Sequence, residues 1–122
     1  MTDRLMRALE CPAVRVLGHL TGRLLLHRES YKFDFDLVAG AAAKRGVWLE
    51  INASPERLDV SGQLIRTAKA KGCKFTISTD AHHPKHLLNM PYGVLTARRG
   101  WLTASDVMNT LFVDDFARAI AK

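Results

Sequence analysis

The hydrophobic positions along the chain repeat in two ways, every three to four residues in some segments and in short unbroken runs in others. The unbroken runs predict three buried strands, at residues 14–18, 47–52 and 74–78. The helical spacing predicts helices before the first strand and between the strands, with Asp34 and Ser61 as N-caps. Helix and strand thus alternate three times, which predicts an α/β domain with parallel strands.

After the third strand the pattern becomes helical. Residues 83–100 predict a helical stretch interrupted by Pro91, residues 103–106 open a further helix, and residues 113–121 form a last one. Residues 19–33 predict a long loop. Because closed barrels need about eight strands, three strands indicate either a small α/β domain or a part of a larger barrel.

Composition and charge narrow the class of protein. The 122 residues are 48% hydrophobic and 25% charged, which favours one folded domain over a disordered chain. No apolar run or leader-like start predicts a membrane or secreted protein, and Cys11 and Cys73 form no paired motif, so we expect a reduced cytoplasmic protein. The net charge is +6, and residues 63–100 carry seven basic side chains and one acidic one. This excess favours an anionic partner such as nucleic acid, although solvated surface charge is the alternative.

Polar side chains with chemical potential follow each predicted strand. His19 follows the first strand, Glu50 and Asn52 end the second, and Asp80 and His82 follow the third. In parallel α/β folds the carboxyl ends of the strands gather the ligand-binding groups. A carboxylate and an imidazole two residues apart can ligate one divalent cation, and this donor set suits Zn²⁺, Mn²⁺ or Fe²⁺. The alternative is that Asp80 caps a helix and His82 lies on the surface, but His19 on the adjoining strand favours the metal site.

Basic side chains near these strand ends could neutralise phosphate. Arg23 and Lys85 are the candidates for phosphate or DNA binding, with Arg28, Arg98 and Arg99 behind them. Each of them taken alone is equally typical of a solvated surface charge.

Five segments, in order along nearly the whole chain, resemble the C-terminal part of the PHP (polymerase and histidinol phosphatase) domain. Three carry the polar residues named above: GHLTGRLLL at 18–26, LEINA at 49–53 and ISTDAH at 77–82. Two more, NMPYGV at 89–94 and TARRGW at 96–101, make the form in bacterial family X DNA polymerases the closest one.

The resemblance implies the C-terminal part of a distorted (βα)7 barrel, with about three parallel strands and flanking helices. It implies phosphoester hydrolysis with water activated by divalent metal (Mn²⁺, Zn²⁺, Fe²⁺ or Mg²⁺), as a 3′→5′ exonuclease or 3′-end-processing activity on DNA. His19, Asp80 and His82 match metal ligands of the family, and Asp80 and His82 are expected to be catalytic. Glu50 and Asn52 match a segment expected to line the site.

The chain also departs from the family pattern. Leu20 stands where the family has proline, and the opening H-x-H motif and the early-strand ligands have no counterpart. We therefore expect residues 1–122 to form a single partial PHP domain without the early strands of the barrel. Whether this chain is an enzyme on its own stays open.

Two alternatives to the enzyme remain. The first is an inactive PHP half that binds the missing N-terminal PHP or polymerase portion, or a second copy of itself, through unpaired sheet edges. The second is a basic DNA-binding domain without a metal, whose affinity would fall with salt and ignore chelators.

Overall fold

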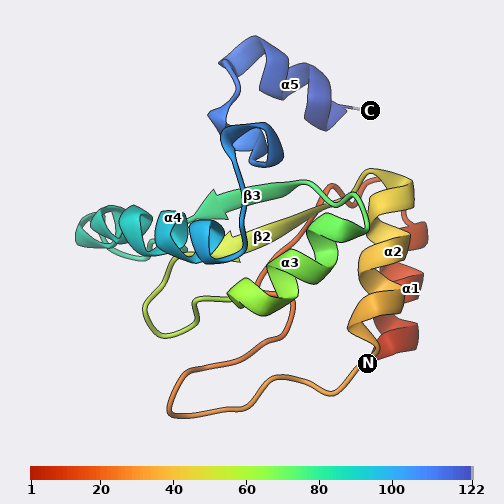
Figure 1. Ribbon diagram of the computed structural model, residues 1–122, viewed down its shortest axis with the longest axis horizontal. Coiled ribbons are helices and arrows are strands. Elements are labelled where there is room, and N and C mark those ends of the chain that lie inside the picture. The colour runs from red at the N-terminus through yellow and green to blue at the C-terminus, as the bar shows by residue number, and fades with distance from the viewer. Residues whose placement is uncertain (122) are drawn as a thin grey trace.

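The computed structural model describes residues 1–121, and Lys122, the last residue of the predicted domain, lies outside them. Helices and strands alternate as predicted through the first two thirds of the chain (Figure 1). The elements are α1 (Thr2–Glu10), β1 (Val16–Leu17), α2 (Phe35–Arg45), β2 (Trp48–Asn52), α3 (Gly62–Ala70), β3 (Phe75–Ser78), the 3-10 turn η1 (Pro84–Asn89), α4 (Met90–Arg99), the 3-10 turns η2 (Ala104–Asp106) and η3 (Met108–Thr110), and α5 (Val113–Ala121).

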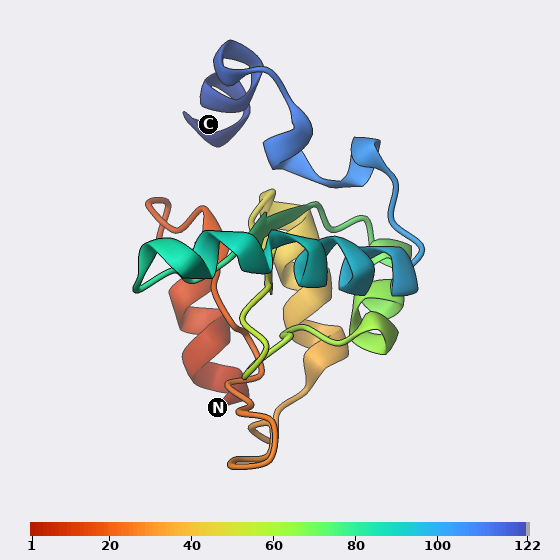
Figure 2. The ribbon, with the colours of Figure 1, turned by 90° about the vertical axis from the view of Figure 1, so that its left-hand side faces the viewer.

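The three strands form one parallel sheet in the order β1-β2-β3, which confirms the predicted α/β class. Ile51 pairs with Ile77 and Asn52 with Ser78, so β2 and β3 end side by side. Helices α1, α2 and α3 lie on one side of the sheet and α5 on the other, as the two views agree (Figures 1 and 2). This arrangement is consistent with part of a PHP barrel.

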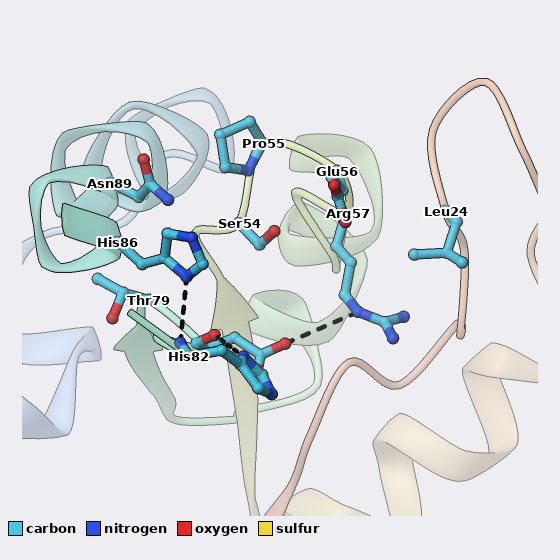
Figure 3. A pocket seen from close by; sticks show the side chains of 10 residues that line it. Leu24, Ser54, Pro55, Glu56, Arg57, Thr79, His82, His86 and Asn89 are labelled. Carbon is cyan, nitrogen blue, oxygen red and sulfur yellow. Dashed lines mark hydrogen bonds and ion pairs between the residues drawn. The ribbon is translucent and has the colours of Figure 1, made fainter. Parts of the chain in front are cut away.

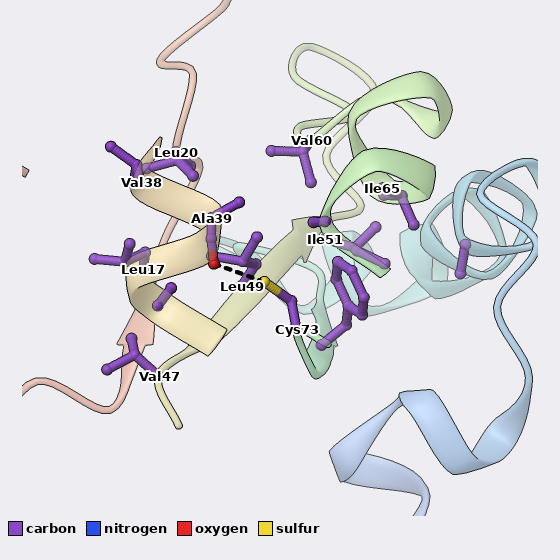
Figure 4. Packing of buried hydrophobic residues seen from close by; sticks show 14 of the residues in the cluster. Leu17, Leu20, Val38, Ala39, Val47, Leu49, Ile51, Val60, Ile65 and Cys73 are labelled. Atoms are coloured by element: carbon purple, nitrogen blue, oxygen red, sulfur yellow. Dashed lines mark hydrogen bonds between the residues drawn. The ribbon is translucent and has the colours of Figure 1, made fainter. Parts of the chain in front are cut away.

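The hydrophobic core lies between the sheet and the helices α2 and α3 (Figure 4). Leu49 and Ile51 of β2 are fully buried against Val38 of α2 and Ile65 of α3, beside Phe75 of β3. Each such side chain contributes about 1.5–3 kcal/mol by leaving water. The alternate residues of β2, among them Glu50 and Asn52, are thereby directed to the other face.

Both predicted N-caps are confirmed. The Asp34 carboxylate accepts a hydrogen bond from the Leu37 amide at 2.9 Å, and the Ser61 hydroxyl accepts one from the Leu64 amide at 3.4 Å. Gly46 ends α2 with φ +64°, a left-handed conformation that glycine adopts without strain.

Two sequence expectations need correction. The first strand is shorter than residues 14–18, because β1 pairs only with β2 and its ladder holds at Val16 and Leu17 alone. Pro91 does not interrupt a helix: it lies in the first turn of α4, where its missing N–H costs nothing, while residues 84–89 form a separate 3-10 turn.

The outer edge of β3 is partly covered. The Asn109 side-chain amide donates to the Ile77 carbonyl at 2.8 Å and accepts from the Ile77 amide at 3.0 Å. Val107 forms a parallel bridge with Phe75 just beside it. This edge, which we expected to be unpaired, is therefore protected by the chain that follows α4. None of the helices formed by residues 1–121 has the length and apolar character needed to span a membrane.

Candidate active site at the carboxyl edge of the sheet

The Glu50 carboxylate joins the ends of all three strands. It accepts a hydrogen bond from the His19 backbone amide at 2.6 Å, another from the Ser78 hydroxyl, and a longer one from the Asn52 amide at 3.4 Å. His19 follows β1, Asn52 ends β2 and Ser78 ends β3. Glu50 therefore fixes the backbone that carries His19 and does not act merely as a lining residue.

Asp80 lies directly beyond β3 in a left-handed conformation, with φ +53°. Few residues other than glycine tolerate this conformation, and aspartate is one of them. Its Oδ2 accepts a hydrogen bond from the Asn52 amide at 3.1 Å and faces the Arg57 Nε at 3.8 Å. Asn52 thus bridges the two carboxylates, Glu50 and Asp80, and Arg57 supplies the positive charge next to Asp80.

His82 stands beside Asp80, as the D-x-H spacing predicted. Its Nδ1 lies 2.6 Å from the Asp80 carbonyl oxygen and 3.9 Å from the Asp80 carboxylate. The His82 backbone amide donates to Nδ1 of His86 at 3.1 Å, which brings a second imidazole to the same place.

A cavity of about 530 Å³ opens in front of these groups (Figure 3). Its polar lining comes from the turn after β2 and the segment after β3, and includes Ser54, Arg57, Asp80, His82, His86 and Asn89. Arginine, imidazole and amide side chains share the cavity with two carboxylates, Glu56 and Asp80, and supply the donors that an anionic, hydrogen-bonding ligand needs.

His19 has a different position. Its backbone is strained, with φ +28°, and its exposed side chain borders a neighbouring hollow together with Leu5, Leu17 and Tyr31. Among the described residues, hydrogen bonds therefore connect His19 through Glu50 and Asn52 to Asp80, which lines the cavity, and His19 itself does not line it. Its role as a metal ligand stays a prediction.

Asp59 holds the loop that carries His19 through hydrogen bonds to its backbone. This carboxylate is fully buried and accepts hydrogen bonds from the backbone amides of Thr21 and Gly22, each at 3.0 Å. Burial raises the pKa of Asp59, and the hydrogen bonds from Thr21 and the nearby Arg23 guanidinium offset this only in part. Asp59 and Arg57 were not predicted from the sequence, because neither directly follows a strand and no local motif marks them.

The two residues predicted to contact phosphate, Arg23 and Lys85, have different surroundings. Arg23 donates from Nε to the Arg57 carbonyl at 2.8 Å and from its terminal nitrogen to the Leu58 carbonyl. The guanidinium has five N–H donors, more than these bonds use, and a phosphate contact of Arg23 stays a prediction. Lys85 lies exposed on η1 near the cavity, where a phosphate contact remains a prediction.

We tested whether these residues fit a divalent metal ion. The donor types fit, since imidazoles and carboxylates are ligands of such ions. Their placement does not: within residues 1–121 no group of three His, Cys, Asp or Glu side chains is arranged to hold an ion. The Asp80 carboxylate faces Arg57 and Asn52, and His82 Nδ1 faces a backbone carbonyl. By themselves, the described residues do not form a metal centre.

The chain is similar in sequence to known proteins, although no family model matches it. The chain is 38% identical over 112 residues to the DNA polymerase/3′-5′ exonuclease PolX of Bacillus subtilis (strain 168), a match that covers 92% of this chain. The predicted resemblance to family X DNA polymerases is confirmed. A probable phosphatase of Vibrio atlanticus (strain LGP32) is 32% identical over 88 residues, or 66% of this chain. Both matches are consistent with the C-terminal part of a PHP domain.

The chain is much shorter than either relative. The matched region makes up 20% of the family X polymerase and 33% of the probable phosphatase.

Proposed function

We propose that the cavity binds a phosphoester and that this chain supplies part of a PHP-type phosphoesterase site acting on DNA ends. The observation that carries the proposal is the meeting of Arg57, Asp80 and His82 in one cavity at the carboxyl edge of a parallel sheet. The names of the two relatives support it, since an exonuclease and a phosphatase both cleave phosphoesters.

Three of the cavity residues, Arg57, His82 and Asp80, have a role in this proposal. The Arg57 guanidinium binds a phosphate oxygen, because arginine presents several N–H donors to such groups. Water attacks the phosphorus, the bond from phosphorus to the leaving oxygen breaks, and His82, whose ring is exposed to the cavity, donates a proton to that oxygen as a general acid. Asp80 orients both groups, since its carboxylate faces Arg57 and its carbonyl faces His82.

The proposal includes the binding of a metal ion and assigns that ion no step of the reaction. His19, Asp80 and His82 are the proposed ligands for Mn²⁺, Zn²⁺, Fe²⁺ or Mg²⁺, but the described residues present no group of three, so a complete centre needs further ligands. Because Nδ1 of His82 faces the Asp80 carbonyl, its other ring nitrogen either binds the ion or donates the proton, and these two roles of His82 are alternatives. The lack of a group of three among the described residues favours a second candidate, an inactive half that binds a partner portion or a second copy of itself.

A hydrolysis assay separates the two candidates. The purified chain is incubated with 3′-phosphorylated DNA and each divalent metal in turn, and phosphate release is measured for wild type, Asp80→Asn and the control Asp36→Asn. Asp36 is an exposed acid on α2, outside the cavity. We expect Asp80→Asn to lose about 100-fold in rate or more, and Asp36→Asn to keep the wild-type rate.

Two results would contradict the proposal. Full activity in Asp80→Asn would remove the cavity from the reaction. An inactive wild type that also holds no metal by elemental mass spectrometry would favour the inactive half, and its sedimentation would then show whether it pairs with a second copy.

A further inference from the structure

The two tryptophans of the chain have opposite environments. Trp48 on β2 is 3% exposed and contacts Phe116 of α5, with the ring centres 5.6 Å apart. Trp101, directly after α4, is 70% exposed and has φ +63°. An aromatic side chain in the left-handed region is uncommon. At Trp101 the backbone thus adopts an unfavourable conformation, and the large indole side chain is exposed to solvent.

Neighbouring cations hold Trp101 in place. The Arg66 guanidinium of α3 lies over one face of the indole, 4.7 Å from the ring centre. Lys69, also of α3, donates to the Trp101 carbonyl at 2.8 Å. Arg66 further donates to the Arg99 carbonyl at 2.8 Å, which ties the end of α4 to α3. The indole is therefore fixed from one side and open on the other.

The charge around this indole is positive and largely uncompensated. Arg98 and Arg99 are exposed in the last turn of α4, next to Trp101. Lys69 is paired with Asp106 at 3.0 Å. Within residues 1–121, however, no acidic side chain forms a salt bridge with Arg66 or with the two arginines of α4.

We propose that Trp101, Arg66, Arg98 and Arg99 form a platform that binds single-stranded nucleic acid. A base stacks on the open face of the indole, and the arginines contact the adjoining phosphates. Indole and guanidinium planes both stack on bases without regard to sequence, and clustered arginines supply the attraction to the backbone. The fixed indole is suited to this role, because little side-chain freedom is lost on binding.

The platform also has a spatial relation to the cavity. Asn89 at the cavity rim directly precedes α4, and Trp101 follows it after Gly100. The ten residues of α4 span about 15 Å, which matches roughly four nucleotides at the ~3.4 Å rise per nucleotide of a stacked strand. That one strand occupies both places rests on the proposed function; binding at the platform does not.

Fluorescence anisotropy with a labelled oligothymidylate of about 12 nucleotides tests the platform, in the presence of EDTA so that hydrolysis plays no part. We expect Trp101→Ala to weaken binding by about 5-fold to 150-fold, since one stacked base contributes this much. Trp101→Phe should recover part of the loss. Tyr92→Ala, which removes another exposed aromatic ring of α4, is the matched control and should bind as wild type.

The charges are tested by the salt dependence of the same binding. The double variant Arg98→Ala with Arg99→Ala should lower the slope of log affinity against log salt by about 1.4, from ~0.7 per phosphate contact. The control pair Lys44→Ala with Arg45→Ala, exposed in the last turn of α2, should leave the slope unchanged.

Several results separate the alternatives. Equal affinity in Trp101→Ala and Tyr92→Ala, with both variants folded by circular dichroism, would overturn the platform. No measurable affinity of wild type for a single strand would also overturn it, and would point to a protein partner for this face. If the wild-type chain fails to hydrolyse 3′-phosphorylated DNA while Trp101→Ala still binds the single strand more weakly than Tyr92→Ala, the proposed function fails and the platform stands.

Discussion

Replacing Asp59 by alanine should destabilise the fold, because it removes a buried hydrogen-bond acceptor. The Asp59 carboxylate is fully buried and accepts the backbone amides of Thr21 and Gly22. These two residues are themselves buried, so water does not readily replace the lost acceptor. The Gly22 amide also donates to the His19 carbonyl at 2.9 Å and keeps that bond, so the variant leaves the Thr21 amide without a partner inside the protein.

The size of the effect follows from these groups. A buried donor left unpaired costs about 1–3 kcal/mol, and here this donor is the Thr21 amide. Removing the buried carboxylate returns part of this, because its burial is unfavourable, as the raised pKa of Asp59 shows. A net loss of about 1–2 kcal/mol remains. Asp59→Asn keeps one acceptor oxygen and should lose about half as much.

Urea unfolding followed by circular dichroism measures the loss, and Asp36→Ala is the control. Asp36 is a largely exposed carboxylate paired with Lys71 at 2.9 Å, so its removal should change the free energy of unfolding by less than about 1 kcal/mol. Hydrogen exchange should show the Thr21 amide among the most accelerated in Asp59→Ala, and the Gly22 amide less so, because it keeps its bond to the His19 carbonyl. The reasoning is refuted if Asp59→Ala unfolds at the same urea concentration as Asp36→Ala.

Two further predictions concern a thiol and a surface acid. Burial raises the pKa of the Cys73 thiol to about 11, so at about pH 8 iodoacetamide should modify exposed Cys11 alone in the native chain and both thiols in denaturant, as counted by mass spectrometry; two rapid native adducts would contradict this. Desolvation opposes ionisation of Asp106, but hydrogen bonds from the Thr103 amide and the Lys69 ammonium outweigh it and hold the pKa of Asp106 below its usual value. Its stabilising contribution is present above about pH 4 and is lost as pH falls through the lowered pKa, so in acid unfolding wild type should lose its advantage over Asp106→Asn; a constant difference down to about pH 2 would refute the assignment.

The elements with local signals could be predicted from the sequence. Asp34 and Gly46 delimit α2 because a capping carboxylate and a left-handed glycine act within one helical turn. The strand at 47–52 was recognised by its apolar run, and its observed bounds differ by one residue. The D-x-H pair was placed correctly beside the sheet edge for the same reason, since both residues follow one strand.

The contacts that organise the site could not be predicted in this way. Asp59 meets Thr21 across 38 positions of the chain, and Arg57 meets Asp80 across 23. No periodicity or spacing marks such a pair, because only the folded turn after β2 brings the two segments together. Arg23 illustrates the same limit: its charge suggested a phosphate contact, which stays a prediction, but nothing in the sequence marked the hydrogen bonds of its guanidinium to two backbone carbonyls.

The ion pair of Arg57 and Asp80 bears on the proposed binding of a phosphoester in the cavity. The two side chains are 3.8 Å apart and partly exposed, so their attraction is worth about 1 kcal/mol or less. A phosphate can therefore draw Arg57 away from Asp80 at little cost, since a charge-assisted bond to phosphate replaces the pair. Asp80 would keep its hydrogen bond from Asn52, so its carboxylate is not left unpaired when Arg57 moves. The weakness of this ion pair is thus what allows an anion to enter beside a carboxylate.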